Sequence, residues 1–261
     1  MASALHIAKT GLDAQQTRMS VIANNLANVG TSGFKKGRAS FEDLLYETVS
    51  QPGGSSSQNT ELPSGLLLGT GVRTVSTEKI FTQGSLNRTD SSLDIAIQGR
   101  GFFQILLPDG ATSYTRDGSF SINSQGQLVS STGYELEPSI NIPPETTSIT
   151  IGADGTVSVL VAGNSAPQQV GNIQLADFIN TQGLQAIGQN LFRETIASGN
   201  PQTGNPGLNG LGSIIQGSLE ASNVNAVEEL VNMIETQRSY EMNSKAIQTV
   251  DEMLQFVSQT L

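Results

Sequence analysis

The residue types that most often carry out catalysis are scarce in this chain of 261 residues. It contains no Cys and a single His, His6, so a thiol nucleophile and a Cys-ligated zinc are excluded and any Ser-His-Asp triad would need His6. The neighbours of His6 follow a helical pattern, and nothing around them resembles a nucleophile turn. We therefore expect an incidental or packing role for His6, and we expect no catalytic residue, no cofactor and no bound metal.

Carboxylates are the remaining candidates for acid–base chemistry. A secreted cell-wall hydrolase would need a pair of them, and Asp109, Asp117 and Asp154 are the candidates. Each of the three directly precedes Gly, and Asp-Gly is a turn signal because Gly tolerates the positive φ of tight hairpins. The pattern favours turns over catalysis, and the hydrolase is kept as an alternative from a different function class.

Composition and charge narrow the function classes further. Hydrophobic residues make up 36% of the chain and charged residues 14%, and the formal net charge is -10. An acidic chain suits nucleic acid poorly, because phosphates are bound through a clustered basic surface. No stretch approaches the roughly 18 apolar residues of a membrane span, and residues 1–25 lack the apolar run of a cleaved signal peptide. We expect no nucleic-acid partner and no small-molecule substrate.

The N-terminal region predicts one amphipathic helix that ends near Asn28. Apolar positions recur every seven residues, with Ile22 between them, at Leu5, Leu12, Met19 and Leu26. Gly30 and Gly33 follow Asn28, and Gly favours non-helical conformations.

The C-terminal region predicts a second, longer helix. One heptad position is held through six cycles by Ala226, Met233, Tyr240, Ile247, Leu254 and Leu261, with support from Leu230, Ile234, Val250 and Val257. Asn225 followed by Glu228 resembles a capping box and places the helix start at Ala226.

Between the helices the apolar pattern changes to a period of two, which is typical of strands. Short runs of this kind occupy residues 92–98, 101–107, 119–123, 147–151 and 156–161. Asp-Gly turn signals separate them, so we expect a compact antiparallel β domain.

Two segments rich in Gly, Ser and Pro, 51–71 and 198–212, connect this middle to the ends and are typical of flexible loops in an isolated chain. The sequence therefore predicts an α+β fold in which long N- and C-terminal helices form a coiled-coil-like pair. Residues 1–30 and 224–261 would form a terminal helical domain, 31–71 an extended segment, and 72–223 a β-rich domain.

The apolar stripes of two long helices must be buried against something. The simplest interpretation is an antiparallel pair within one molecule. The C-terminal helix, however, has apolar residues on several sides, and a two-helix hairpin covers only one stripe, so helices of neighbouring molecules are indicated as well. The Asn-rich stretch 23–28 has two interpretations: its amides are exposed to solvent, or they bridge to neighbouring chains.

Residues 21–36 read VIANNLANVGTSGFKK, and residues 219–255 begin LEASNVNAVEE. These two segments resemble the N-terminal and C-terminal signatures of the flagellar rod and hook protein family. DIAIQGRGFF at 94–103 and YTRDGSF at 114–120 also match. Both terminal signatures occur in the right order, and the resemblance covers essentially the whole chain. The length and residues 46–72 most resemble the distal-rod members, while proximal-rod and hook subunits are the nearest alternatives.

The resemblance implies a structural, non-enzymatic subunit of the bacterial flagellar basal body. Its members polymerise helically into a drive shaft that crosses the periplasm to the outer membrane and transmits torque from motor to hook. The implied partners are further copies of the chain, the proximal rod proteins, the hook protein, the P-ring and L-ring proteins, the rod cap protein and the flagellar type III export apparatus, which reads no cleaved signal peptide. A surface adhesion module would also suit a β-rich middle, but it needs no heptad-patterned ends.

The resemblance also implies which residues form the assembly interface. Residues 31–71 would become an ordered extension wedged between subunits. The expected interface residues are Leu5, Leu12, Met19, Ile22, Asn24, Asn25, Leu26, Asn28, Leu230, Met233, Tyr240, Ile247, Leu254 and Leu261.

Overall fold

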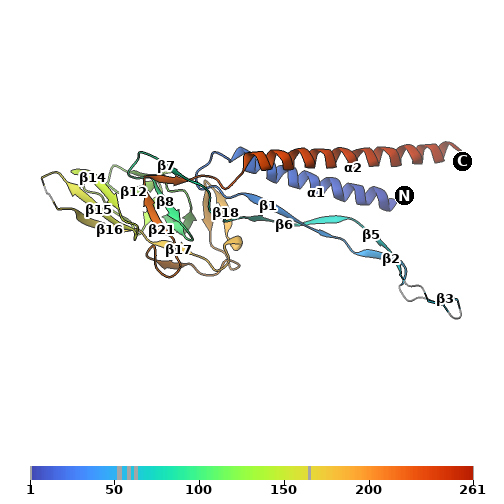
Figure 1. The fold of residues 1–261 in the computed structure, drawn as a ribbon, viewed down its shortest axis with the longest axis horizontal. Coiled ribbons are helices and arrows are strands. Elements are labelled where there is room, and N and C mark those ends of the chain that lie inside the picture. Colours follow the sequence, from blue (N-terminus) through green and yellow to red (C-terminus); the bar gives the residue numbers. More distant parts are fainter. Residues whose placement is uncertain (1, 52–54, 58–59, 62–63, 164–165, 261) are drawn as a thin grey trace. The chain divides into compact units, whose positions relative to one another are not determined.

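The fold is known from a computed structural model, which describes residues 2–51, 55–57, 60–61, 64–163 and 166–260 (Figure 1). Helices occupy the two ends of the chain and strands its middle, so the predicted α+β class is confirmed. The chain divides into two compact units. Unit 1 comprises Met1–Ala27, Gly37–Glu78 and Asn225–Leu261, and unit 2 comprises Asn28–Lys36 and Lys79–Val224. The predicted extended segment 31–71 contributes to both units, and its role between subunits stays a prediction.

The helices of unit 1, α1 (Ala2–Ala27) and α2 (Ala226–Thr260), lie side by side and antiparallel (Figure 1). Asn25 Nδ2 lies 3.4 Å from Glu229 Oε2, and a Cβ built on Gly11 would lie 3.0 Å from Nδ2 of Asn243. Positions 11 and 25 have the same spacing as 229 and 243, so the register between the helices is constant over this span. Supercoiling of the pair stays a prediction.

The predicted helix limits agree with the structure. Asn225 caps α2, because its Oδ1 accepts hydrogen bonds from the N–H groups of Val227 at 3.1 Å and Glu228 at 3.4 Å. Helix α1 ends at Ala27, one residue before the predicted Asn28. Among the described residues, no helix combines the length and the apolar character that crossing a bilayer requires.

A series of two-stranded antiparallel pairs follows α1 along the chain. Strand β1 (Gly37–Asp43) pairs with β6 (Val72–Lys79), β2 (Tyr46–Ser50) with β5 (Leu66–Gly69), and β3 (Ser55–Ser57) with β4 (Thr60–Glu61). The composition of 51–71 predicted a flexible loop in the isolated chain. That interpretation is wrong for the described residues of β3, β4 and β5, which backbone pairing holds in strands. We call the β2–β5 pair the ribbon.

The main sheet of unit 2 has the strand order β11-β12-β13-β9-β10-β19-β18. Strand β17 also pairs with β9, and β20 pairs with β17. These strands are β9 (Phe102–Leu106), β10 (Thr112–Thr115), β11 (Phe120–Ile122), β12 (Leu128–Ser130), β13 (Glu135–Glu137), β17 (Leu175–Asp177), β18 (Gln185–Gly188), β19 (Leu191–Arg193) and β20 (Gln202–Gly204). A short 3-10 helix, η1 (Thr181–Gly183), precedes β18. The pairings described within this sheet are antiparallel, as predicted.

Smaller sheets complete unit 2. Strands β14 (Thr146–Ile151), β15 (Thr156–Val161) and β16 (Gln168–Asn172) form one of them, in that order. The others are the pairs of β8 (Ile95–Gln98) with β21 (Ser213–Gln216) and of β7 (Leu86–Arg88) with β22 (Ser218–Glu220).

The core of unit 2 lies on both faces of β9. Phe103 and Ile105 pack in a cluster of aliphatic residues from β8, β12, β13 and β15, whereas Phe102 packs with Phe178 and Phe192. Phe102 to Ile105 are all buried because β9 is central, with β10, β13 and β17 as neighbours. Strand β9 therefore departs from the predicted alternation of buried and exposed residues.

The Asp-Gly signals mark turns for two different physical reasons. Gly110 and Gly155 have φ of 82° and 85°, as expected for hairpins. Gly118 has no such φ, so the predicted reason is wrong at this position. A Cβ there would lie 1.6 Å from the carbonyl oxygen of Ile95, and only Gly permits this close approach of two backbones.

Candidate assembly interface

The two most buried side chains of α2 are polar. Glu229 and Thr236 are 5% and 0% exposed, and Asn243 and Val250, which continue the same seven-residue spacing, are half-buried. Residues seven apart lie on nearly the same side of a helix. The most buried positions of α2 therefore hold a carboxylate and a hydroxyl, while Met233, Ile247 and Val250 of the predicted apolar pattern are half-buried.

The opposite side of α2 is exposed and carries apolar side chains interspersed with charged ones, which include Arg238, Glu241, Lys245 and Glu252. At 3.6 residues per turn, positions five or six residues after Glu229 lie across the helix from it. We call the exposed apolar residues on this side of α2 the outer face. They are Val227, Leu230, Val231, Ile234, Met242, Met253 and Phe256. Apolar side chains on a solvent-facing helix surface indicate a contact that a single copy of the chain leaves unmade.

Asn25 holds the start of β1 against α1. Its Oδ1 accepts the Gly37 N–H at 2.8 Å, its Nδ2 donates to Gly37 O at 2.9 Å, and the residue is 2% exposed. The amide thus pairs with Gly37 as a neighbouring strand would. Neither interpretation of the Asn-rich stretch describes Asn25, which is buried and bonded within its own chain. Asn24 is exposed, and Asn28 Oδ1 accepts the Thr31 hydroxyl at 3.2 Å.

The structure sorts the expected interface residues by burial in one copy of the chain. Ile22 and Asn25 are buried; Leu5, Leu12, Met19, Leu26, Asn28, Met233 and Ile247 are half-buried; and Asn24, Leu230 and Tyr240 are exposed. The side chains of Leu254 and Leu261 lie outside the described residues. Their contacts with other copies stay predictions.

Unit 2 holds a buried ionic cluster that the sequence analysis missed. Lys35 Nζ donates to Glu220 Oε1 at 2.5 Å and to Thr82 O at 2.9 Å, and Arg116 donates to Glu220 Oε2 at 3.3 Å and to Gly99 O at 2.7 Å. The side chains of Lys35 and Glu220 are 0% exposed. Burial lowers the pKa of Lys35, since the desolvation of its ammonium outweighs the attraction of Glu220. No local pattern could predict a pair 185 residues apart in the sequence.

This cluster fixes the chain segments that lead to both helices onto unit 2. Glu220 O accepts the Gly33 N–H at 2.8 Å, and Asn223 Oδ1 accepts the Lys36 N–H at 2.7 Å. Asn223 Nδ2 also donates to Ile80 O at 2.8 Å. The segment after α1 and the segment before α2 are therefore bonded to each other and to the strands of unit 2. Both terminal signatures contribute to this junction.

The ribbon carries a second set of exposed apolar side chains. Leu66, Leu67 and Leu68 are 51%, 51% and 47% exposed, and Tyr46 and Val49 on the paired strand are also exposed. Consecutive residues of a strand point to opposite faces. Both faces of the ribbon therefore carry exposed apolar side chains.

The carboxylates considered for catalysis are turn residues. In each, the Oδ1 atom accepts a hydrogen bond from the backbone N–H two residues later. The donors are Ala111 for Asp109 at 3.0 Å, Ser119 for Asp117 at 3.1 Å and Thr156 for Asp154 at 3.2 Å. The hydroxyl of Thr156 also donates to Asp154, which lowers the pKa of that carboxyl. His6 is exposed on α1. The described part of the chain holds no group of three or more His, Cys, Asp or Glu placed to bind one metal ion.

Protein-family models match three parts of the chain. The model described as "Flagella basal body rod protein" matches residues 5–35. "Flagellar hook protein FlgE/F/G D1 domain" matches 96–159, and "Flagellar basal body rod FlgEFG protein C-terminal" matches 215–260. The first match covers most of α1, the third contains α2, and the second lies in unit 2.

Curated relatives are similar over nearly the whole chain. The flagellar basal-body rod protein FlgG of Buchnera aphidicola subsp. Schizaphis graminum is 59% identical over 259 residues, which cover 99% of this chain and 100% of the relative. FlgG of Caulobacter vibrioides is 51% identical over 257 residues, 98% of each chain. FlgG of Bacillus subtilis is 39% identical over 261 residues, which cover 98% of this chain and 97% of the relative.

Proposed function

Because this chain belongs to the family of flagellar basal-body rod proteins and is a structural subunit of the distal rod, we propose that its copies assemble into an open helix through the outer face of α2. The observation that carries this proposal is the exposure of large apolar side chains on α2, where the buried positions are Glu229 and Thr236 while the seven apolar residues of the outer face are exposed. Fully burying an exposed Leu, Ile or Val contributes about 1.5–3 kcal/mol. Several such residues on each copy favour a stable contact.

The same contact repeated from copy to copy gives a tube. A heterologous contact joins different surfaces of two copies and forms an open helix when its rotation does not close a ring. Helix α1, with its half-buried Leu5, Leu12 and Met19, supplies further apolar surface beside α2. We propose that these residues, together with Leu254 and Leu261 at the end of the chain, complete the interface around the tube.

The ribbon supplies a second contact in this proposal. The apolar side chains on its two faces fit a position between neighbouring copies, as expected for the extended segment 31–71. A ribbon inserted between subunits would resist their displacement and stiffen the tube. The role is mechanical: torque passes through many repeated contacts, and no catalysis is involved.

The position of this rod within the basal body belongs to the same proposal. One end would join the proximal rod proteins and the other the hook protein, while the P-ring and L-ring proteins surround the shaft between periplasm and outer membrane. Growth would occur beneath the rod cap protein after export by the flagellar type III apparatus. Membership of the family supports these partners.

Electron microscopy of the concentrated full-length chain at neutral pH tests the proposal. We expect straight tubes from the unaltered chain and none from the triple variant Leu230→Ser, Val231→Ser, Ile234→Ser, because the outer face would lose its central apolar residues. The matched control changes Gln237 and Gln248, exposed polar residues on the same helix, to Ser. Helix content measured by circular dichroism should be equal in all three. Tubes from the triple variant would contradict a role for the outer face.

A further inference from the structure

The side-chain amide of Gln216, a half-buried residue of β21, bonds to two distant segments of the chain. Its Oε1 accepts the Ile151 N–H at 3.1 Å, and its Nε2 donates to Ile149 O at 2.9 Å and to Ser92 O at 2.7 Å. A primary amide has two N–H donors and one carbonyl acceptor. Both donors and the acceptor of Gln216 are therefore engaged, although its partners lie 65 to 124 residues away in the sequence.

On β14 these bonds have the pattern of a parallel strand. A residue in a parallel ladder donates to the C=O of the residue before its partner and accepts from the N–H of the residue after it. The Gln216 amide bonds to Ile149 O and to the Ile151 N–H in this way, on either side of Thr150. Thr150 itself pairs with Ser158 of β15. On the edge of β14 away from β15, the side chain therefore supplies the bonds that a neighbouring backbone would otherwise make.

The backbone of β21 does not continue the sheet to β14. Strand β21 pairs with β8 along its whole length, and among the described residues these two strands form a sheet separate from β14-β15-β16. Beside β14, the Ile214 N–H donates to Ala153 O at 3.1 Å. The chain then turns at Gly217, whose φ is 70°. Strand β21 thus ends at Gln216, and it is the side chain of that residue that reaches the second half of β14.

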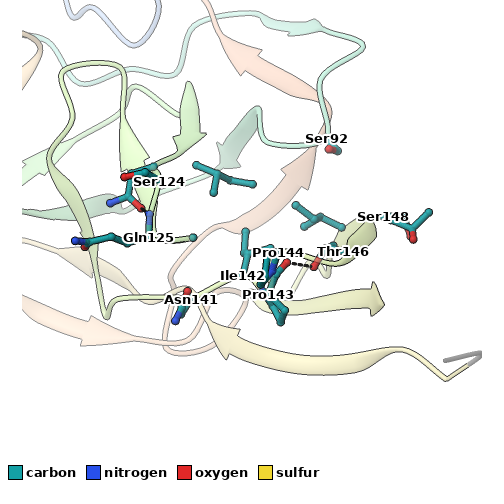
Figure 2. Close-up of a pocket in the computed structure, with 14 residues that line it drawn as sticks. Ser92, Ser124, Gln125, Asn141, Ile142, Pro143, Pro144, Thr146 and Ser148 are labelled. Atoms are coloured by element: carbon teal, nitrogen blue, oxygen red, sulfur yellow. Dashed lines mark hydrogen bonds between the residues drawn. The ribbon is translucent and has the colours of Figure 1, made fainter. Parts of the chain in front are cut away.

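A pocket of about 640 Å³ borders the first half of β14 (Figure 2). Its other walls are the turn after β11 and the segment 141–144. Figure 2 shows Ser148 of β14 and Ser124 of the turn after β11 on different sides of it. Ser92 and Ile149, whose carbonyl groups accept from the Gln216 amide, also line the pocket. The first half of β14 therefore borders a hollow, whereas the bonds of Gln216 hold its second half.

We infer that Gln216 is a positioning residue, whose amide fixes the sheet β14-β15-β16 to the remainder of unit 2. Ile151 and Val157 of this sheet share a core cluster with Ile97 and Ile214. Burial of apolar surface brings the two parts together but is non-directional, whereas the three directed hydrogen bonds of the amide set one register. Unit 2 then moves as one body, which a load-bearing subunit of the rod requires. The inference goes beyond the proposed contact on α2, because every group in it lies within unit 2 of one copy.

Hydrogen–deuterium exchange of the full chain, kept dilute so that single copies prevail, tests this role. Gln216→Met keeps an unbranched side chain of similar length but removes the amide. The segment 146–152 should exchange at least about tenfold faster, since a strand that loses hydrogen bonds opens more often. Strand β9, in the centre of the main sheet, should exchange as before. The matched control is Gln168→Met, at an exposed position on β16 of the same sheet as β14.

Two outcomes of this experiment would overturn the inference. Equal exchange of 146–152 in the unaltered chain, Gln216→Met and Gln168→Met would show that the amide does not hold β14. Equal acceleration of β14 and β9 in Gln216→Met would show that the amide stabilises unit 2 as a whole and does not position the sheet.

The variant Gln216→Glu gives a second readout, because it replaces the donor nitrogen by oxygen and keeps the shape of the side chain. At neutral pH the carboxylate directs negative charge at Ile149 O and Ser92 O, whereas the protonated carboxyl group offers one donor and one acceptor. The folded chain should therefore bind this proton more tightly than the unfolded chain. The variant should then lose stability as the pH rises above the ordinary Glu pKa of about 4.3. Asp94 and Asp154, on segments that adjoin β8 and β14, are present in both chains, and their titration cancels in the comparison.

The difference in thermal unfolding temperature between Gln216→Glu and the unaltered chain measures this effect. It should be small near about pH 4 and amount to several degrees near about pH 7. A difference that does not depend on pH would refute directed bonding by the amide. Both measurements use single copies, so their outcome is separate from that of the proposed polymer, which the absence of tubes from the unaltered chain would refute.

Discussion

Three buried ionisable side chains, Lys35, Arg116 and Glu220, bring two positive charges and one negative charge into the interior of unit 2. The carbonyl groups of Thr82 and Gly99 accept further hydrogen bonds from the two cations, which compensates part of the lost hydration. The cluster joins the segment after α1 to the strand before α2. Because the cluster holds two cations and one anion, loss of the anion should lower the free energy of unfolding more than loss of one cation.

Glu220→Gln should destabilise unit 2 more than Lys35→Met does. Removal of Glu220 leaves two buried cations without an anion, and breaking a buried pair in this way costs about 3–5 kcal/mol. Removal of Lys35 leaves Arg116 and Glu220 as a balanced pair, so the cost should be smaller. Urea unfolding of both variants, followed by hydrogen exchange of the unit 2 strands, measures the two costs. The reverse order would show that the charge balance of the cluster is not what stabilises it.

The pH dependence of the same variants gives an independent readout. Because burial lowers the pKa of Lys35, the unfolded chain binds this proton more tightly than the folded chain does, and stability from this group rises with pH up to the ordinary lysine pKa of about 10.4. The stability of the unaltered chain relative to Lys35→Met should therefore increase as the pH rises toward the ordinary lysine pKa of about 10.4. Burial raises the pKa of Tyr114, which costs both chains stability at alkaline pH and cancels in the difference.

At the scale of the element, α2 shows what an apolar pattern can and cannot predict. Its existence, its start and its Asn225 cap follow from local rules and are present in the structure. The side that faces α1 does not follow from them, because the pattern identifies a surface that needs a partner without identifying the partner. Glu229 and Thr236 are buried, while Leu230 and Ile234 face solvent. The five predicted runs in unit 2 correspond to β8, β9, β11, β14 and β15, although β8 and β9 do not alternate. The prediction of a flexible loop over 198–212 is wrong at β20, which pairs with β17.

The ribbon carries a prediction of its own. Leu66→Thr, Leu67→Thr and Leu68→Thr together keep a residue type that favours strands while removing the apolar surface from both faces. We expect tubes to form still, since the outer face of α2 is intact, but to bend more because the ribbon no longer packs between subunits. Tube curvature in electron micrographs measures this effect. The control replaces exposed Thr48, which is already polar, with Ser; tubes as straight as the unaltered ones from the triple variant would exclude a stiffening role.

At the scale of the whole molecule, the burial of residues within one copy cannot identify contacts made only in an assembly. The sequence predicted the helical ends, the β-rich middle and the family, whereas the Lys35–Glu220 pair required the folded chain because its partners are remote in sequence. Exposed apolar side chains on α2 and the ribbon favour association of copies, whereas the formal net charge of -10 opposes it. The two effects respond differently to salt.

Salt should therefore favour assembly of this chain. Thirteen basic and 23 acidic residues give each copy a formal net charge of -10, so copies repel one another at long range. Raising the ionic strength from about 0.01 M to about 0.15 M shortens the screening length from about 30 Å to about 8 Å and weakens that repulsion, whereas contacts through apolar side chains keep their strength. The critical concentration for tube formation, measured by sedimentation, should fall over this range. If ion pairs between subunits held the tube together, the same salt would screen them and the critical concentration would rise.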